Sequence, residues 1–241
     1  MVSEDILKME GISKSFPGVK ALDNVDFALR KGDIHAIVGE NGAGKSTLIK
    51  IITGVYEEGA GRIALNGRPI HFKSPQEAQN SGIGTVYQEI ALCPNLTVAE
   101  NMFIGRGQYT FAQWKQMNEK AAQMLDSLDI PASPTQELSS CWFAVVQMIA
   151  IARAVDMDCK ILILDEPTSS LEEDEVKKLF DLMRELKSRG VGIIFITHFI
   201  DQVYEISDKI TVLRNGALIG EYQASALPQI ELISKMMGKA L

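Results

Sequence analysis

The sequence lacks the features that mark several broad classes of protein. It has three cysteines in 241 residues, Cys93, Cys141 and Cys159, and their spacing is not that of a metal site. We therefore expect reduced thiols in a reducing compartment, and the sequence argues against a disulfide framework. The chain is long enough to bury a substantial core without such cross-links.

Long apolar runs are also missing. The most apolar stretch, Trp142–Val155, is interrupted by Gln147 and Arg153. It is too short to cross a bilayer, which takes about 20 residues. We therefore expect a cytoplasmic chain whose membrane role, if it has one, depends on a partner.

Positive charge is scarce. The chain has 24 Lys and Arg against 31 Asp and Glu, a formal net charge of −7, and no run of five or more basic residues. Proteins that bind nucleic acid usually carry a basic stripe. The sequence therefore argues against a nucleic-acid partner.

What is present is an alternation of short apolar runs with helical patterns. Ile34–Val38, Lys160–Leu164 and Val191–Ile196 are nearly continuous apolar runs, typical of strands covered on both faces. A helix is predicted from about Lys45 to Thr53. This order predicts an α/β fold with a mainly parallel sheet.

The helix after the second strand is predicted in more detail. Ser170 and Glu173 are interpreted as a capping box at its start, and Gly190 follows its end. Apolar residues recur at helical spacing along it. They are Val176, Leu179, Phe180, Met183 and Leu186.

Two further parts complete the predicted organisation. Leu7–Ile12 and Val25–Leu29 alternate as antiparallel strands do, which predicts an N-terminal β subdomain. The middle of the chain predicts an inserted α-helical subdomain with one helical face of Trp114, Met117, Ala121, Leu125 and Leu128. We expect one domain over residues 1–241, with the core and β subdomain at about 1–88 and 156–241 and the helical subdomain at about 89–155. Residues 223–241 are expected to form a short helix.

A glycine-rich loop follows the first core strand. It fits the pattern G-x-x-x-x-G-K-[ST] and consists of Gly39, Glu40, Asn41, Gly42, Ala43, Gly44, Lys45, Ser46 and Thr47. Glycines let successive N–H groups face one anion, and the helix that follows directs its positive end at phosphates. Lys45 would supply a charge to the β- and γ-phosphates, and Ser46 a ligand for Mg²⁺. With the mainly parallel sheet, this loop predicts a P-loop NTPase core. The alternative is a glycine-rich turn with a chance Lys-Ser pair.

Two carboxylates end the second core strand. Asp165 is expected to hold Mg²⁺ through water, and Glu166 to act as general base on the attacking water. The alternative is a strand that happens to end in a polar turn. Gln88 follows a short strand, Thr85–Tyr87, and could reach the metal and the water, or be an ordinary surface glutamine. His198 ends the third core strand and could contact the γ-phosphate, or be structural.

Together these residues resemble the ATP-binding domains of ABC transporters over almost the whole chain. Gly39–Thr47 resembles Walker A, Ile161–Glu166 Walker B, Gln88 the Q-loop and His198 the switch histidine. Residues 169–172 resemble the D-loop, with Glu172 where Asp is usual. Phe16 resembles the aromatic that stacks on adenine, with a core phenylalanine as the alternative.

A narrower resemblance is to the first ATPase domain of monosaccharide importers. It rests on residues 16–22, 82–89, 95–106, 197–216 and 232–239. In that group two such domains usually lie in tandem, so we expect either a single-domain piece or a shortened member. The resemblance implies ATP and Mg²⁺ as cofactors and a second ABC domain bound head to tail. It also implies permease subunits, indirectly a solute-binding protein, and a place on the inner face of the cell membrane.

The signature L-S-G-G-Q of the family is not intact. Leu138-Ser139-Ser140-Cys141-Trp142 begins correctly but lies three residues too far from Ile151-Ala152-Arg153-Ala154. Counting back from that block places the signature on Cys141, Trp142, Phe143, Ala144 and Val145. We prefer this second register because an insertion inside a packed helix start is costly. The segment could also be an ordinary apolar helix start.

Three functions follow. The first is an ATPase that powers import of a sugar or similar small solute. The second, an ABC protein acting on nucleic acid or ribosomes, is disfavoured by the net charge of −7. The third is a nucleotide-gated regulatory ABC module with weak turnover because of its degenerate signature.

Overall fold

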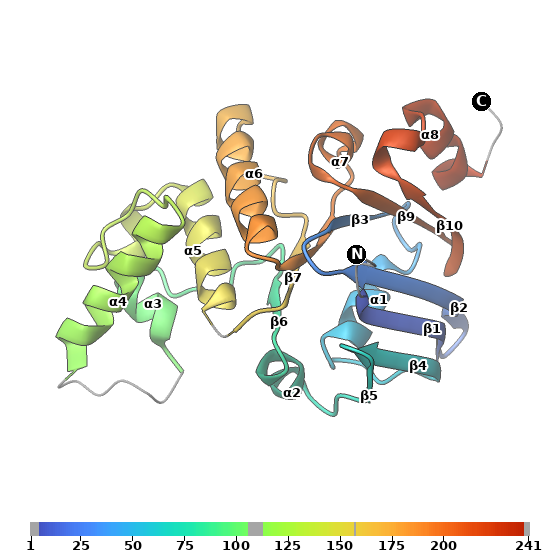
Figure 1. Ribbon diagram of the computed structural model, residues 1–241, viewed down its shortest axis with the longest axis horizontal. Coiled ribbons are helices and arrows are strands. Elements are labelled where there is room, and N and C mark those ends of the chain that lie inside the picture. Colours follow the sequence, from blue (N-terminus) through green and yellow to red (C-terminus); the bar gives the residue numbers. More distant parts are fainter. Residues whose placement is uncertain (1–4, 106–112, 157, 239–241) are drawn as a thin grey trace.

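The protein is represented by a computed structural model, and the structure describes residues 5–105, 113–156 and 158–238. Arg106, at the end of one segment of the narrower resemblance, lies outside the described residues. So do Lys239 and residues 240–241 of the predicted tail helix. In Figure 1 the α-helical part occupies one end of the molecule and two sheets the other.

A six-stranded sheet forms the centre of the fold, in the order β10-β9-β3-β8-β7-β6. It is parallel from β9 to β6, and only β10 runs antiparallel to its neighbour. This confirms the predicted mainly parallel core. The strands are β3 (Ile34–Val38), β6 (Ile83–Val86), β7 (Ile161–Asp165), β8 (Gly192–Ile196), β9 (Lys209–Arg214) and β10 (Ala217–Gln223).

A second, antiparallel sheet has the order β2-β1-β4-β5 and confirms the predicted β subdomain. Its strands are β1 (Asp5–Phe16), β2 (Val19–Arg30), β4 (Ala60–Leu65) and β5 (Arg68–Ile70). The first two are much longer than the predicted segments. They pair along their whole length, down to Phe16 opposite Val19 at the hairpin turn. His71 lies just beyond β5.

Helix α1 (Lys45–Ile52) is packed between the two sheets. Its apolar residues share one core cluster with inward-facing residues of β1, β2, β7 and β8. Alternate residues of β7 face opposite ways: Ile161 and Ile163 join this cluster, whereas Leu162 and Leu164 join a second one under α5 and α6. Both faces of the central sheet are therefore covered, which explains its continuous apolar strands.

The middle of the chain forms the inserted helical part, on the left of Figure 1. It contains α3 (Val98–Phe103), α4 (Trp114–Ser127), the short 3₁₀ helix η2 (Leu138–Ser140) and α5 (Phe143–Val155). Met117, Ala121 and Leu125 of the predicted helical face are buried, while Trp114 is 37% exposed. The boundaries at residues 89 and 155 stay a prediction.

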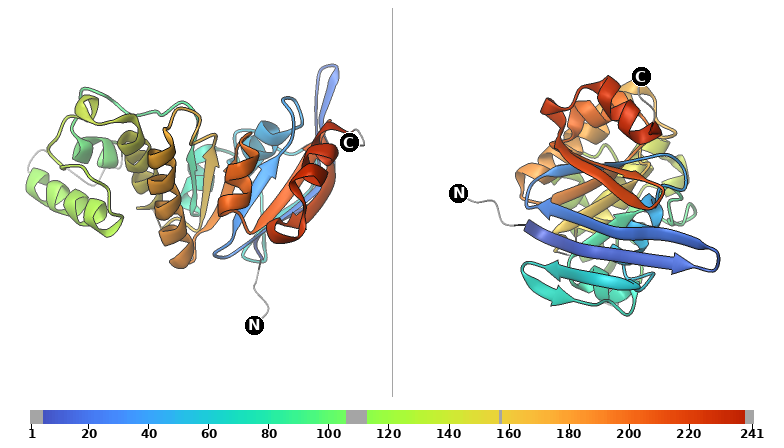
Figure 2. Two further views of the ribbon diagram at one scale, coloured as in Figure 1. Left: turned by 90° about the horizontal axis from the view of Figure 1, so that it is seen from above. Right: turned by 90° about the vertical axis from the view of Figure 1, so that its right-hand side faces the viewer.

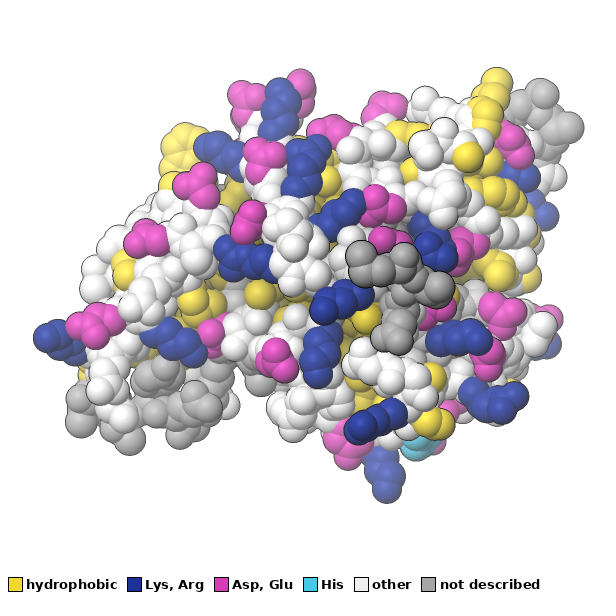
Figure 3. Space-filling view, in the orientation of Figure 1, with side chains coloured by type: hydrophobic (Ala, Val, Ile, Leu, Met, Phe, Trp, Pro, Cys, Tyr) yellow, Lys and Arg dark blue, Asp and Glu magenta, His cyan; other side chains and the backbone are white. Residues whose placement is uncertain are grey.

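The remaining helices complete the layers. They are α2 (Pro75–Asn80), α6 (Glu173–Ser188), α7 (Ile200–Ile206), the 3₁₀ helix η3 (Ala224–Ala226) and α8 (Gln229–Met237). None of the helices within the described residues combines the length and the apolar character needed to span a membrane. On the face drawn in Figure 3, basic and acidic side chains are interspersed.

Three local predictions are corrected. The capping box of α6 is formed by Glu172 and Glu175, and the predicted pair of Ser170 and Glu173 is wrong. Glu172 is the N-cap, and its N–H donates to the carboxylate of Glu175 at 2.9 Å. The strand before Gln88 is Ile83–Val86 and ends before Tyr87. The tail begins with the end of β10 and η3, so its helix starts only at Gln229.

Candidate functional site

The glycine-rich loop connects β3 to the start of α1. Gly42 and Gly44 have φ angles of +82° and +107°, which side chains other than glycine rarely adopt. A Cβ atom on Gly44 would also lie 2.8 Å from the carbonyl oxygen of Ala21. Gly44 is the N-cap of α1 and has no capping side chain, so the first N–H groups of this helix are left for a ligand.

Lys45 is held inside the same loop. Its ammonium group donates to the carbonyl oxygens of Gly39, at 2.6 Å, and Glu40, at 3.1 Å. Burial lowers the pKa of Lys45, and the nearby carboxylates of Glu166 and Asp165 oppose that shift. The loop therefore presents a partly desolvated cation beside the helix start, a suitable partner for a phosphate group.

A pocket of about 430 Å³ opens at this loop. It brings together most of the predicted site residues from four different segments of the chain. These are Phe16, Asn41, Gly42, Gly44, Lys45, Ser46, Thr47, Gln88, Asp165 and Glu166. Gly39, Glu40 and Ala43 do not line the pocket but shape the loop, since the N–H of Ala43 donates to the Glu40 carbonyl at 3.0 Å.

Asp165 is the last residue of β7, at the carboxyl edge of the parallel sheet. Burial, and then the charge of Glu166, raise the pKa of its carboxyl group. Asp165, Ser46 and Gln88 line the same pocket and offer carboxylate, hydroxyl and amide oxygens. Oxygen donors of this kind fit Mg²⁺, which commonly takes one carboxylate and completes its shell with phosphate oxygens and water.

Glu166 has an unusual backbone for a non-glycine residue. Its φ angle is +49°, and its N–H donates to the carbonyl oxygen of Ile196 on β8 at 2.9 Å. Such a conformation costs free energy and persists only where the surroundings enforce it, often at functional sites. The side chain is 26% exposed and lines the pocket.

His198 lies between β8 and α7 and reaches the pocket through Glu166. Its Nδ1 atom lies 3.5 Å from Oε1 of Glu166, and its ring packs on that of Phe199 at 4.1 Å. The side chain is 59% exposed and does not itself line the pocket. His35, on β3, is in contrast fully buried, and its ring forms hydrogen bonds with the Ala28 carbonyl and the Thr211 hydroxyl.

Phe16 lines the same pocket as the loop. It ends β1, is half-buried, and contacts the ring of Tyr56 edge-on. Sequence reasoning missed three lining residues, Val19, Ala21 and Ile196. The pairing of Val19 with Phe16 across a Pro-Gly turn is the one signal that could have placed it there.

The segment predicted as a degenerate signature lies at the start of α5. Trp142 is the N-cap of this helix without a capping hydrogen bond, and it is 78% exposed. Phe143 is 46% exposed, Cys141 and Val145 are half-buried, and Ala144 is buried. A helix therefore begins inside the second register. The hydroxyls of Ser139 and Ser140, in the first register, instead bond to the carboxylate and carbonyl of Glu137.

Comparison with known proteins places the chain among ATP-binding proteins of transporters. The sequence model of the ABC transporter family matches residues 22–169. The galactofuranose transporter ATP-binding protein of Escherichia coli (strain K12) is 53% identical over 240 residues, 99% of this chain and 48% of that protein. The fructose import ATP-binding protein of Bifidobacterium longum is 49% identical over 239 residues, 98% of this chain and 46% of that protein.

The chain thus spans about half the length of the curated relatives it matches. Among solved structures, a nucleotide-free ATP-binding cassette from an ABC transporter superposes with a TM-score of 0.84 at 28% identity, over 98% of this chain and 96% of the other. A cassette in its ADP conformation superposes with a TM-score of 0.83 at 28% identity, with the same coverage.

Proposed function

The chain belongs to the ABC transporter family, and on that premise we propose that it binds ATP with Mg²⁺ and hydrolyses it to power import of a sugar or similar small solute. The observation that carries this proposal is the single pocket that combines the phosphate loop with Gln88, Asp165 and Glu166. The loop, Gln88 and the pair Asp165–Glu166 come from three separate parts of the chain, and each has a chemical task in phosphoryl transfer.

In the proposed reaction the loop and Lys45 hold the phosphates, and Phe16 stacks on the base. Bound Mg²⁺, held by Ser46, Gln88 and Asp165, would neutralise charge on the phosphate oxygens. Glu166 accepts a proton from the attacking water, whose oxygen forms the new bond to the γ-phosphorus while the bond to the ADP oxygen breaks. We propose that His198, whose Nδ1 atom lies 3.5 Å from Oε1 of Glu166, orients this carboxylate and contacts the γ-phosphate.

The proposed solute class rests on the names of relatives. Proteins at 43–53% identity are named for galactofuranose, fructose and ribose import. Since similar ATP-binding chains are named for different sugars, we propose that other subunits choose the solute. These are permease subunits in the membrane and, indirectly, a solute-binding protein. The chain would then lie at the inner face of the cell membrane, paired head to tail with a second ABC domain.

The regulatory alternative gains no support from the comparisons, because these relatives are named for import. The degenerate signature itself remains part of our proposal. In the family, the signature of one domain covers the ATP bound to the other. Trp142 and Phe143 would offer bulk and no hydroxyl there. We propose that this chain binds ATP through its own loop but closes a partner's site poorly.

The function is tested by binding and turnover. Titration calorimetry of the chain with ATP and Mg²⁺ should show one site, and Lys45→Met should weaken it because a charge-assisted phosphate contact is lost. Turnover is measured in a complex with the proposed permease subunits. A chain that binds no nucleotide, or a complex that hydrolyses none, would refute the proposal.

A further inference from the structure

The aromatic ring proposed to stack on the base has a second aromatic ring as its support. The ring centroids of Phe16 and Tyr56 are 5.2 Å apart and the ring planes meet at 65°, an edge-to-face contact. Phe16 lines the pocket, whereas Tyr56 is half-buried outside it. A contact of this geometry favours one orientation of the ring over others.

Tyr56 is fixed by the end of α1, the helix that follows the phosphate loop. After Gly54, with φ of +70°, the N–H groups of Val55 and Tyr56 both donate to the carbonyl oxygen of Lys50, at 2.8 and 2.9 Å. The ammonium group of Lys50 lies 5.3 Å from the centre of the Tyr56 ring. One short helix therefore positions the phosphate loop at its start and the support of Phe16 at its end.

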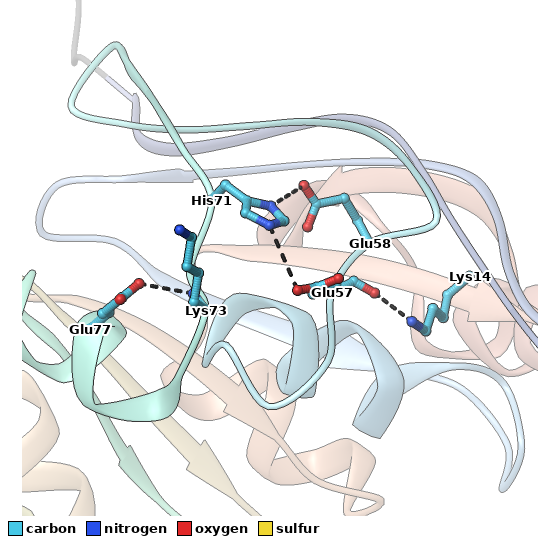
Figure 4. Close-up of polar contacts among 6 residues, drawn as sticks. All are labelled: Lys14, Glu57, Glu58, His71, Lys73 and Glu77. Carbon is cyan, nitrogen blue, oxygen red and sulfur yellow. Dashed lines mark hydrogen bonds and ion pairs between the residues drawn. The ribbon is translucent and has the colours of Figure 1, made fainter.

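Lys14 joins the two rings from the side of β1. Its ammonium group lies 5.7 Å from the centre of the Phe16 ring and 5.9 Å from that of Tyr56, within range of a cation–π contact with each. The same group donates to the carbonyl oxygen of Glu57 at 2.6 Å, as Figure 4 shows. Lys14 therefore ties the end of β1 to the segment that carries Tyr56.

The segment after Tyr56 is anchored on its other side too. Figure 4 shows His71, beyond β5, between the carboxylates of Glu58 and Glu57. Its Nδ1 atom lies 3.0 Å from Glu58 and its Nε2 atom 3.9 Å from Glu57. The N–H of Gly59 donates to the carbonyl oxygen of Ser13 at 2.8 Å. With contacts to β1, α1 and the residues after β5, this segment is a fixed support.

From this arrangement we infer that Tyr56 and Lys14 are positioning residues that hold Phe16 in the orientation in which it stacks on the purine base of the nucleotide. The inference rests on the proposed function and deepens it. Neither residue lines the pocket at the phosphate loop. Their effect is therefore confined to ligands that carry a base, and it passes entirely through Phe16.

The test compares a ligand with a base to one without. Affinities for ATP and for inorganic tripolyphosphate, each with Mg²⁺, are measured by titration calorimetry. An edge-to-face pair is worth about 0.5–1.5 kcal/mol, so Tyr56→Leu should weaken ATP binding roughly two- to tenfold and leave tripolyphosphate binding unchanged. Tyr56→Phe keeps the ring and should behave as the parent. Lys14→Met should weaken ATP in the same selective way.

Two controls sharpen the test. Lys20→Met removes an exposed lysine of the same hairpin, paired with Asp23 at 2.6 Å, and should change neither affinity. In a Phe16→Leu background, Tyr56→Leu should cause no further loss of ATP affinity. The inference would be overturned if Tyr56→Leu weakened binding of ATP and tripolyphosphate equally. It would also be overturned if Tyr56→Leu weakened ATP binding as much in the Phe16→Leu background as in the parent. Failure of the parent to bind ATP at all would instead overturn the proposed function.

Discussion

His198 stands next to Glu166, with Nδ1 of the histidine 3.5 Å from Oε1 of the glutamate. The two residues follow the neighbouring parallel strands β7 and β8, whose ends are aligned by the pairing of Asp165 with Ile196. The positive φ angle of Glu166 accompanies a hydrogen bond from its N–H to the same Ile196. The sheet itself thus brings the proposed base and the histidine together.

Replacing Glu166 by Gln should separate binding from turnover. The amide keeps the size of the side chain but cannot accept the proton of the attacking water. We expect a fall in kcat of roughly 10²–10⁴-fold, the usual contribution of a general base, with ATP affinity within a few-fold of the parent. Single-turnover hydrolysis and titration calorimetry measure the two quantities. Retained turnover would remove Glu166 from the catalytic role.

His198→Ala should act on the same step. Because the histidine contacts Glu166 and does not line the pocket, we expect lower kcat with little change in ATP affinity. If the pair works as a unit, adding His198→Ala to Glu166→Gln should cost little more than Glu166→Gln alone. Independent, multiplying losses measured by steady-state kinetics would show that the contact is not functional.

Much of this site could be predicted because its determinants are local in the sequence. The loop from Gly39 to Thr47 needs glycines and a lysine at fixed spacing, and β7 is a short apolar run that ends in Asp165 and Glu166. Their roles depend on the chemistry of adjacent residues. The strand before the loop and the helix after it could be predicted for the same reason.

The rest depends on contacts between distant segments. Ala21, on β2, lines the pocket together with the distant loop, and Ile196 is brought there by the pairing of β8 with β7, and no local pattern encodes either contact. The capping box of α6 was misplaced because Glu172 takes the capping role that serine usually has. The contact of Tyr56 with Phe16 links residues 40 positions apart, so composition gave no sign of it.

Gly44→Ala should damage both stability and binding. At φ of +107° the new Cβ atom would lie 2.8 Å from the Ala21 carbonyl oxygen, so the loop must shift. Gly67→Ala is a matched control, since Gly67 has φ of +73° but no heavy atom within 4 Å. Gly67→Ala should cost about 1–2 kcal/mol of unfolding free energy. Gly44→Ala should cost more and also lose ATP affinity. If urea unfolding shows the same loss of stability for Gly44→Ala and Gly67→Ala, the loop accommodates the new Cβ atom at no added cost.

His35 should make stability depend on pH. Burial lowers its pKa from 6.5 to about 4. Between these values the unfolded chain binds a proton that the folded chain does not, so the free energy of unfolding falls as the pH is lowered. A shift of one pKa unit corresponds to about 1.4 kcal/mol, so the full loss of unfolding free energy is roughly 3 kcal/mol. Urea unfolding from pH 7 to 4.5 should show a shallower loss for His35→Gln than for the parent. His71→Gln, at an exposed histidine, should keep the steeper loss.

The start of α5 gives the last prediction. Trp142 and Phe143 are exposed at a helix start where the family signature would present a hydroxyl and glycine N–H groups. Restoring these groups with Trp142→Ser and Phe143→Gly should raise turnover of the complex with a partner ABC domain, because the partner's γ-phosphate gains hydrogen bonds at a helix N-terminus. Ile230→Ser is the control for a general surface effect. It removes an apolar side chain on α8 that is 66% exposed. If the double variant is no faster than the parent, Trp142 and Phe143 do not limit closure of the partner's site.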